Sequence, residues 1–320
     1  MSRFSPSEAA FAGLRLIRDR PAAFAVWTLL NLLAVAAIAG LFLAIVGPSL
    51  PSFMDAIKSG QAGASPTTAP FLMEQMTTLQ VFQRLAQVLS FVALVAINCA
   101  VFRAVLDPDR SGFAALRMGP DEFRVGVVKF AFALMWGLGG FVLALGILVV
   151  VLGGAAVSGA HVSPTVVGWS IGLSILILVL VGLVVGVRLS LAEVMSFDSG
   201  RLQFFDSWAL TRNSFWPMLG AYLLAWLMAM MLALGLVIAV GAVLAAVLLG
   251  TGANWPGAGD WTSLRPVVGP AMLAWLAMGA LAGALIRVIM VGPAAYIYAA
   301  LTDEPASTCP LRQSPAGLVL

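Results

Sequence analysis

Residues 166–191 read VVGWSIGLSILILVLVGLVVGVRLSL, and within this stretch no charged side chain precedes Arg188. A bilayer core about 30 Å thick is crossed by roughly 20 apolar residues of α-helix. Because lipid offers the backbone no hydrogen-bond partner, such a run must satisfy its own amides, as a helix does. It is also too long and too continuously apolar for a membrane β-strand. The stretch therefore predicts a transmembrane helix that ends on an arginine.

The whole chain shares this apolar character. Of its 320 residues, 61% are hydrophobic and 10% are charged, with a mean hydropathy of +1.03, whereas a soluble domain carries about 25% charged residues. A soluble fold of this size could not hide so much apolar surface from water. We therefore predict an all-α integral membrane bundle of six transmembrane helices, near Ala23–Val46, Phe82–Val105, Val125–Leu152, Val166–Val187, Met218–Leu249 and Val267–Met290.

Three of these spans end on an arginine in a similar apolar setting. The second span ends VFRAVL, the fourth GVRLSL and the sixth LIRVIM, and the arginines are Arg103, Arg188 and Arg287. Each closes the second helix of a predicted hairpin. The three hairpins would therefore finish on the same side of the bilayer.

The distribution of Lys and Arg predicts the orientation, because these residues favour the cytoplasmic side. One side would carry only Lys58 and Arg265. The other would carry thirteen, namely Arg3, Arg15, Arg18, Arg20, Arg103, Arg110, Arg117, Arg124, Lys129, Arg188, Arg201, Arg212 and Arg312. We predict a bacterial inner-membrane protein with both termini in the cytoplasm.

The segments before the first, third and fifth spans also resemble one another. Residues 11–19 read FAGLRLIRD, residues 205–213 read FDSWALTRN, and residues 113–118 read FAALRM before a break at Gly119-Pro120. On a helix the apolar residues share one face, so each segment predicts a helix lying in the cytoplasmic interface. The predicted organisation is a single membrane domain, 1–320, with hairpin repeats at about 5–106, 110–191 and 200–301 and a tail at 302–320.

The three span-terminal arginines have two interpretations. Each could extend its guanidinium to lipid phosphates from a helix end one turn inside the membrane. Alternatively, the three could form a basic ring around a central cavity that binds an anionic headgroup. Arg18 and Arg212, on the predicted interfacial helices, are further candidates for anionic lipid. Apolar residues continue past Arg287 to Leu301, so this arginine is expected to lie deeper than the others.

Few other polar side chains fall near the spans. Asn31 and Asn98 predict interhelical hydrogen bonds. The alternative is a polar path, for which Asn31, Asn98 and Glu193 are the candidates. Glu193 is the acidic residue nearest Arg188 in the sequence, and an arginine of another hairpin is its expected partner. Close helix packing is indicated by three pairs of small residues, Gly168/Gly172, Gly182/Gly186 and Gly279/Gly283.

The sequence offers no constellation for catalysis. Residues 257–260 read GAGD, like the Gly-x-Gly-Asp of intramembrane aspartyl proteases, but no predicted span supplies the second aspartate that this chemistry needs. His161 is the only histidine, and Cys99 and Cys309 are too few for a metal framework. Nucleotide-binding fingerprints are absent. We therefore predict no enzyme activity, cofactor, metal or nucleic-acid partner.

The segment SWALTRNSFW at 207–216, which leads into the fifth span, is similar to a motif of poorly characterised bacterial membrane proteins. These include the YciC-type inner-membrane proteins and the membrane region attached to some glycerophosphodiester phosphodiesterases. The resemblance is compatible with six spans and implies no catalytic residues. We predict a non-enzymatic organiser or binder of lipid headgroups. The alternative is a small-molecule or lipid transporter with a cavity between the hairpins.

Overall fold

A computed structural model describes residues 4–49, 69–107, 115–116, 119–158, 164–250 and 265–302. Helix accounts for 91% of these residues, and none of them forms a strand. The interpretations placed on Lys58, His161, residues 257–260 and Cys309 concern residues outside these ranges.

Among the described residues, six helices are long and apolar enough to cross a membrane, which agrees with the six predicted spans and supports a multi-pass membrane protein. The candidate spans within them are 25 to 31 residues long. The six are α3 (Pro21–Ile45), α5 (Ala69–Leu106), α6 (Pro120–Ser158), α7 (Pro164–Leu189), α10 (Phe215–Gly250) and α11 (Arg265–Leu301).

Proline begins three of these long helices, α3 at Pro21, α6 at Pro120 and α7 at Pro164. Proline suits the first helical position because its missing amide has no intrahelical partner there. In α6 the backbone N–H of Gly119 also donates to the Glu122 carboxylate at 2.8 Å, so an acidic side chain stabilises the positive end of the helix. These prolines favour the observed starts of α3, α6 and α7.

The last helix extends further than the sequence indicates. We expected it to end near Met290, but α11 continues through Gly292-Pro293 to Leu301. A proline inside a helix costs one backbone hydrogen bond, yet membrane helices tolerate this cost. Consequently Arg287 does not close its helix, whereas Arg103 and Arg188 lie in the last turns of α5 and α7.

Short helices precede or connect the spans. Two of them, α2 (Ala12–Asp19) and α9 (Asp206–Thr211), fall where interfacial helices are predicted. Most of the third predicted segment lies outside the described residues, but its Ala115 has a φ of +53° and is therefore not α-helical. The remaining short elements are α1 (Pro6–Ala10), η1 (Gly47–Ser49) and α8 (Ala192–Asp198).

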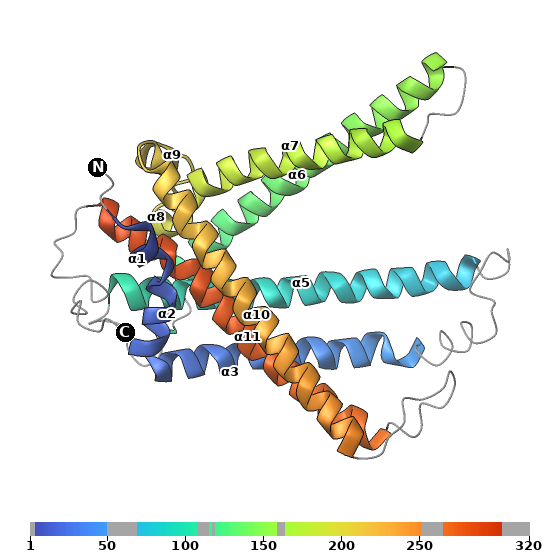
Figure 1. Cartoon of the computed structure of the whole chain (residues 1–320), viewed down its shortest axis with the longest axis horizontal. Coiled ribbons are helices and arrows are strands. Elements are labelled where there is room, and N and C mark those ends of the chain that lie inside the picture. Colours follow the sequence, from blue (N-terminus) through green and yellow to red (C-terminus); the bar gives the residue numbers. More distant parts are fainter. Residues whose placement is uncertain are drawn as a thin grey trace. The chain divides into compact units, whose positions relative to one another are not determined.

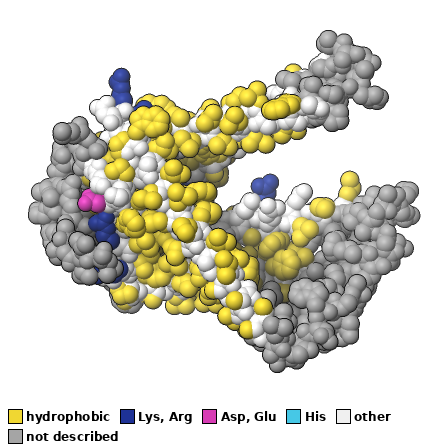
Figure 2. Space-filling model, in the orientation of Figure 1, with side chains coloured by type: hydrophobic (Ala, Val, Ile, Leu, Met, Phe, Trp, Pro, Cys, Tyr) yellow, Lys and Arg dark blue, Asp and Glu magenta, His cyan; other side chains and the backbone are white. Residues whose placement is uncertain are grey.

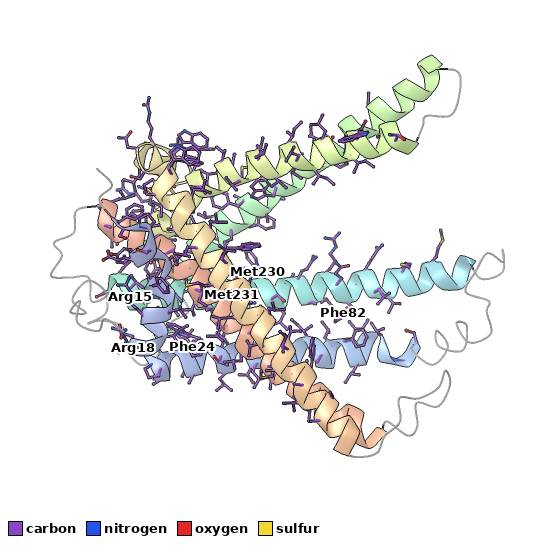
Figure 3. All side chains as sticks on the ribbon, in the orientation of Figure 1. Arg15, Arg18, Phe24, Phe82, Met230 and Met231 are labelled. Carbon is purple, nitrogen blue, oxygen red and sulfur yellow. The ribbon has the colours of Figure 1, made fainter. Side chains whose placement is uncertain are left out.

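The chain forms two compact units. Unit 1 comprises Met1–Ala12, Met118–Leu224 and Gly292–Leu320, and unit 2 comprises Gly13–Arg117 and Ala225–Val291. In unit 2, α3 and α5 run side by side (Figure 1). Phe82 of α5, labelled in Figure 3, meets Phe42 of α3 edge to face with ring centroids 5.3 Å apart.

In unit 1, α6 and α7 lie side by side as a hairpin (Figure 1). They approach closely where Gly182 faces the Trp136 ring, since an added Cβ would lie 2.6 Å from that ring. Hydrophobic side chains cover the exposed sides of the long helices (Figure 2). In α6 the most apolar window contains no buried residue, which is the surface expected of a helix solvated by hydrocarbon.

Candidate functional site: an arginine pocket beside α9

Hydrogen bonds of two serine side chains hold the connection that follows α7 in unit 1. Ser196 of α8 accepts a hydrogen bond from the Gln203 amide at 2.9 Å, across a turn in which Gly200 has a φ of +65°. Ser207, in the first turn of α9, donates its hydroxyl to the Arg188 carbonyl at 2.6 Å. That carbonyl lies at the end of α7, where carbonyls lack intrahelical partners. The bond therefore fixes α9 against the end of α7.

Arg188 is positioned by two aromatic rings. The centre of its guanidinium lies 5.4 Å from the ring of Trp208 on α9 and 5.4 Å from the ring of Phe215 at the start of α10. Both distances suit a cation–π interaction. The Nε and Nη1 atoms of Arg188 are buried and have no hydrogen-bond partner among the described residues. Unpaired buried donors are costly, and charged ones more so.

Arg188 lines a pocket of about 720 Å³ together with Phe205, Trp208, Ala209 and Arg212. Arg212 follows Trp208 by four residues, which places the two on the same side of α9. Phe205 and Trp208 are 77% and 44% exposed. The pocket therefore combines two cations with two accessible aromatic faces. Such a site fits an anion joined to an apolar group.

The predicted site residues of unit 2 have other surroundings. Arg287 donates from Nη1 to the Oδ1 atom of Asn31 at 2.9 Å. Asn31 in turn donates from Nδ2 to the Ala280 carbonyl at 2.7 Å, so it forms interhelical hydrogen bonds as predicted. Arg103 donates to the Ala115 carbonyl at 3.2 Å. Arg18 projects from α2 (Figure 3) and is exposed.

The structure thus brings Arg188 and Arg212 together, whereas Arg103, Arg287 and Arg18 belong to unit 2. The basic ring of three arginines stays a prediction.

Glu193 forms an ion pair with Lys129 of α6 at 2.8 Å, where the sequence suggested an arginine of another hairpin. Lys129 lies about two turns after the start of α6. The sequence placed it among the basic residues of the predicted cytoplasmic side, but its pairing with Glu193 was not predicted. Asn98 is 1% exposed and lies within the buried part of α5. The ion pair with Lys129 indicates that Glu193 contributes to the packing of α8 against α6.

Two of the three predicted glycine pairs contact a neighbouring helix, each through one of its two glycines. Gly182 faces Trp136, and Gly283 faces Asn31. Around Gly168, Gly172, Gly186 and Gly279 a Cβ would meet nothing within 4 Å. One glycine is therefore packed in each of the pairs Gly182/Gly186 and Gly279/Gly283, and neither glycine is packed in Gly168/Gly172.

Sequence reasoning missed Phe205, Trp208 and Phe215 as partners of Arg188. All three fall within or beside the segment 207–216 that carries the resemblance to other membrane proteins. The sequence therefore marked this segment, but it gave no indication that its aromatic residues contact Arg188. Within the described residues, no three His, Cys, Asp or Glu side chains gather as a metal site would require. Comparisons with protein families, characterised proteins and solved structures give no match for this chain.

Proposed function

We propose that this chain is a non-enzymatic inner-membrane protein of bacteria that binds the anionic headgroup of a lipid in the pocket of Arg188 and Arg212. Both termini lie in the cytoplasm in this proposal, and the pocket faces the cytoplasmic leaflet. The observation that carries the proposal is a pair of buried Arg188 nitrogens, Nε and Nη1, which have no hydrogen-bond partner among the described residues.

A lipid phosphate fits the chemistry of this pocket. Arginine presents planar donors that match phosphate oxygens, and a second cation from Arg212 adds to the attraction. Phe205 and Trp208 offer exposed aromatic surface of the kind that prefers the headgroup layer. The aromatic contacts also hold the Arg188 guanidinium in place before a ligand arrives, which lowers the entropic cost of binding.

The charge distribution supports this orientation. Basic residues crowd the connections that adjoin α2 and α9, and the cytoplasmic leaflet is rich in anionic lipid. In α2, Ala12 and Leu16 are buried while Arg18 and Asp19 are exposed, the pattern of a helix with one apolar and one charged face. A helix of this kind suits the membrane interface.

The test is lipid retention by the purified full-length protein. Native mass spectrometry would measure the affinity for phosphatidylglycerol of the wild type and of the double variant Arg188→Gln/Arg212→Gln. The control is Arg201→Gln, which removes the same charge from an exposed position in the same connection.

We expect the double variant to lose at least about tenfold in affinity, because charged hydrogen bonds contribute this much or more. The Arg201 control should match the wild type. Equal affinity of the double variant and the wild type would refute the proposal.

A further inference from the structure

A second arginine, Arg287, contacts a buried side chain of unit 2. Arg287 is the middle residue of the candidate span Leu273–Leu301, and its Nη1 atom lies 2.9 Å from the Oδ1 atom of Asn31 on α3. Asn31 is 3% exposed and lies within the candidate span Pro21–Ile45. An ionisable side chain at such a position is expensive and commonly functional.

The surroundings of Asn31 fix the direction of its amide. Its Nδ2 atom donates to the Ala280 carbonyl at 2.7 Å, which leaves Oδ1 to accept from Arg287. Gly283 makes room for this arrangement, because a Cβ there would lie 2.8 Å from Nδ2. Ala280, Gly283 and Arg287 are three or four residues apart on α11 and therefore share one face. The Arg287 guanidinium is therefore bound by an uncharged group, the Asn31 amide.

Over the parts that the structure describes, the helices around Arg287 supply no buried carboxylate to offset its charge. Asp19 of α2, the helix that packs against α11 at Gly13, is exposed. The sequences of α3 and α11 contain neither Asp nor Glu, and the part of α10 in unit 2 contains none. The acidic residue of α5, Glu74, lies near its start, far along the helix from the buried end. Among the described residues Arg287 has no ion-pair partner. A neutral amide spreads the charge of a guanidinium but does not cancel it.

We propose that Arg287 is an anion-binding site within the membrane, at which a phosphate group enters beside Asn31 and supplies the missing negative charge. Arg287 is only part-buried, so part of this residue is accessible. The phosphate belongs to an anionic lipid or to a soluble phosphate. This site shares no residue with the Arg188 pocket and is independent of it.

Two substitutions of Asn31 separate this role from a structural one. Asn31→Asp and Asn31→Ala both lose the bond to Ala280, but only the aspartate places a carboxylate beside Arg287. An internal carboxylate replaces the external anion, so Asn31→Asp should release the ligand whereas Asn31→Ala should keep it. Arg287→Gln should also release it. Arg84→Gln, which removes an exposed arginine of α5, is the charge control.

Native mass spectrometry of the full-length variants with phosphatidylglycerol is the first measurement. We expect Arg287→Gln and Asn31→Asp to lose at least about tenfold in affinity, and Asn31→Ala and Arg84→Gln to match the wild type. The proposal would be overturned if Asn31→Asp and Asn31→Ala bound phosphatidylglycerol equally well and inorganic phosphate, in the measurement described next, stabilised neither the wild type nor Asn31→Ala. This comparison decides even if Arg287→Gln fails to fold.

The second measurement identifies the source of the phosphate. The wild type and both Asn31 variants are placed in phosphatidylcholine nanodiscs, and their thermal unfolding is followed as inorganic phosphate is added. Stabilisation of the wild type and Asn31→Ala, but not of Asn31→Asp, would assign the site to a soluble anion. A response to phosphatidylglycerol alone would assign it to a lipid. If only Arg188→Gln/Arg212→Gln loses affinity for phosphatidylglycerol, and neither Asn31 variant differs from the wild type in its response to inorganic phosphate, the Arg287 site is refuted. The proposal for the Arg188 pocket then still stands.

Discussion

The Nζ atom of Lys129 lies 2.8 Å from the Oε1 atom of Glu193 and joins α6 to the short helix α8. Both side chains are largely buried, with 16% and 17% of their surface exposed. By contrast, the pair formed by Asp121 and Arg124 lies within the first turns of α6 and is 36% and 30% exposed. The two pairs therefore differ in how much of their charge is removed from water.

This difference predicts unequal effects on stability. Lys129→Met should lower the free energy of unfolding by about 3–5 kcal/mol, because it leaves the Glu193 charge buried without its cation. Replacing both residues by apolar ones should restore most of the loss. Asp121→Asn should cost less than about 1 kcal/mol. Denaturant titration in detergent micelles, followed by circular dichroism, would measure each change, and similar losses for Lys129→Met and Asp121→Asn would contradict the assignment.

Gly13 gives a second prediction, because α2 packs there against the backbone of α11. An added Cβ would lie 2.5 Å from the Val288 carbonyl oxygen and 2.7 Å from the Ile289 Cα. Backbone cannot move aside as a side-chain tip can, so Gly13→Ala should destabilise the protein by about 1–3 kcal/mol.

The matched control is Gly279→Ala, on a face of α11 where a Cβ meets nothing within 4 Å. This change should be neutral or stabilise the helix by up to about 1 kcal/mol. The same unfolding titration compares the two. A Gly13 variant as stable as the Gly279 variant would show that α2 does not make this close contact.

Trp208 tests the aromatic support of the proposed lipid pocket. Trp208→Ala removes a ring that lies 5.4 Å from the Arg188 guanidinium. Since a partly desolvated cation–π contact contributes about 1–2 kcal/mol, phosphatidylglycerol affinity should fall severalfold or more. Trp226→Ala, which removes an exposed tryptophan of α10, should leave affinity unchanged. Loss in both variants alike would indicate a general effect of tryptophan on detergent or lipid contact.

The proposed orientation predicts the behaviour of fused reporters. A fluorescent protein that matures only in the cytoplasm should fluoresce when fused to the C-terminus, and an alkaline phosphatase fusion there should be inactive. Inserting the reporters into the connection between α3 and α5 should reverse both results. Active phosphatase at the C-terminus would overturn the orientation and the cytoplasmic placement of the Arg188 pocket.

The six spans were predictable because each is a long apolar run, and the energy of moving such a run into lipid depends on composition rather than on tertiary contacts. The end of α11 was not, since Gly292-Pro293 reads as a helix stop in water. Within a membrane the alternative to helix is an unpaired backbone, so the helix continues to Leu301.

The candidate site was predictable in part. Arg188 was selected as a span-terminal arginine and Arg212 as a cation of a predicted interfacial helix. The rings that hold Arg188 come from α9 and α10, and nothing in the local pattern fixes that geometry. The partner of Asn31 could not be read from the sequence at all, because Arg287 lies 256 residues away. Contacts of such separation depend on how the helices pack.

The bond between Asn31 and Arg287 has a consequence for biogenesis. The Asn31 amide leaves the ribosome 249 residues before Ala280 and 256 residues before Arg287, the two residues that it bonds. Until then this amide must be shielded by the insertion machinery or by water. Unit 2 therefore completes its packing only after α11 has been synthesised, and a chain truncated before α11 would leave the Asn31 amide without these partners.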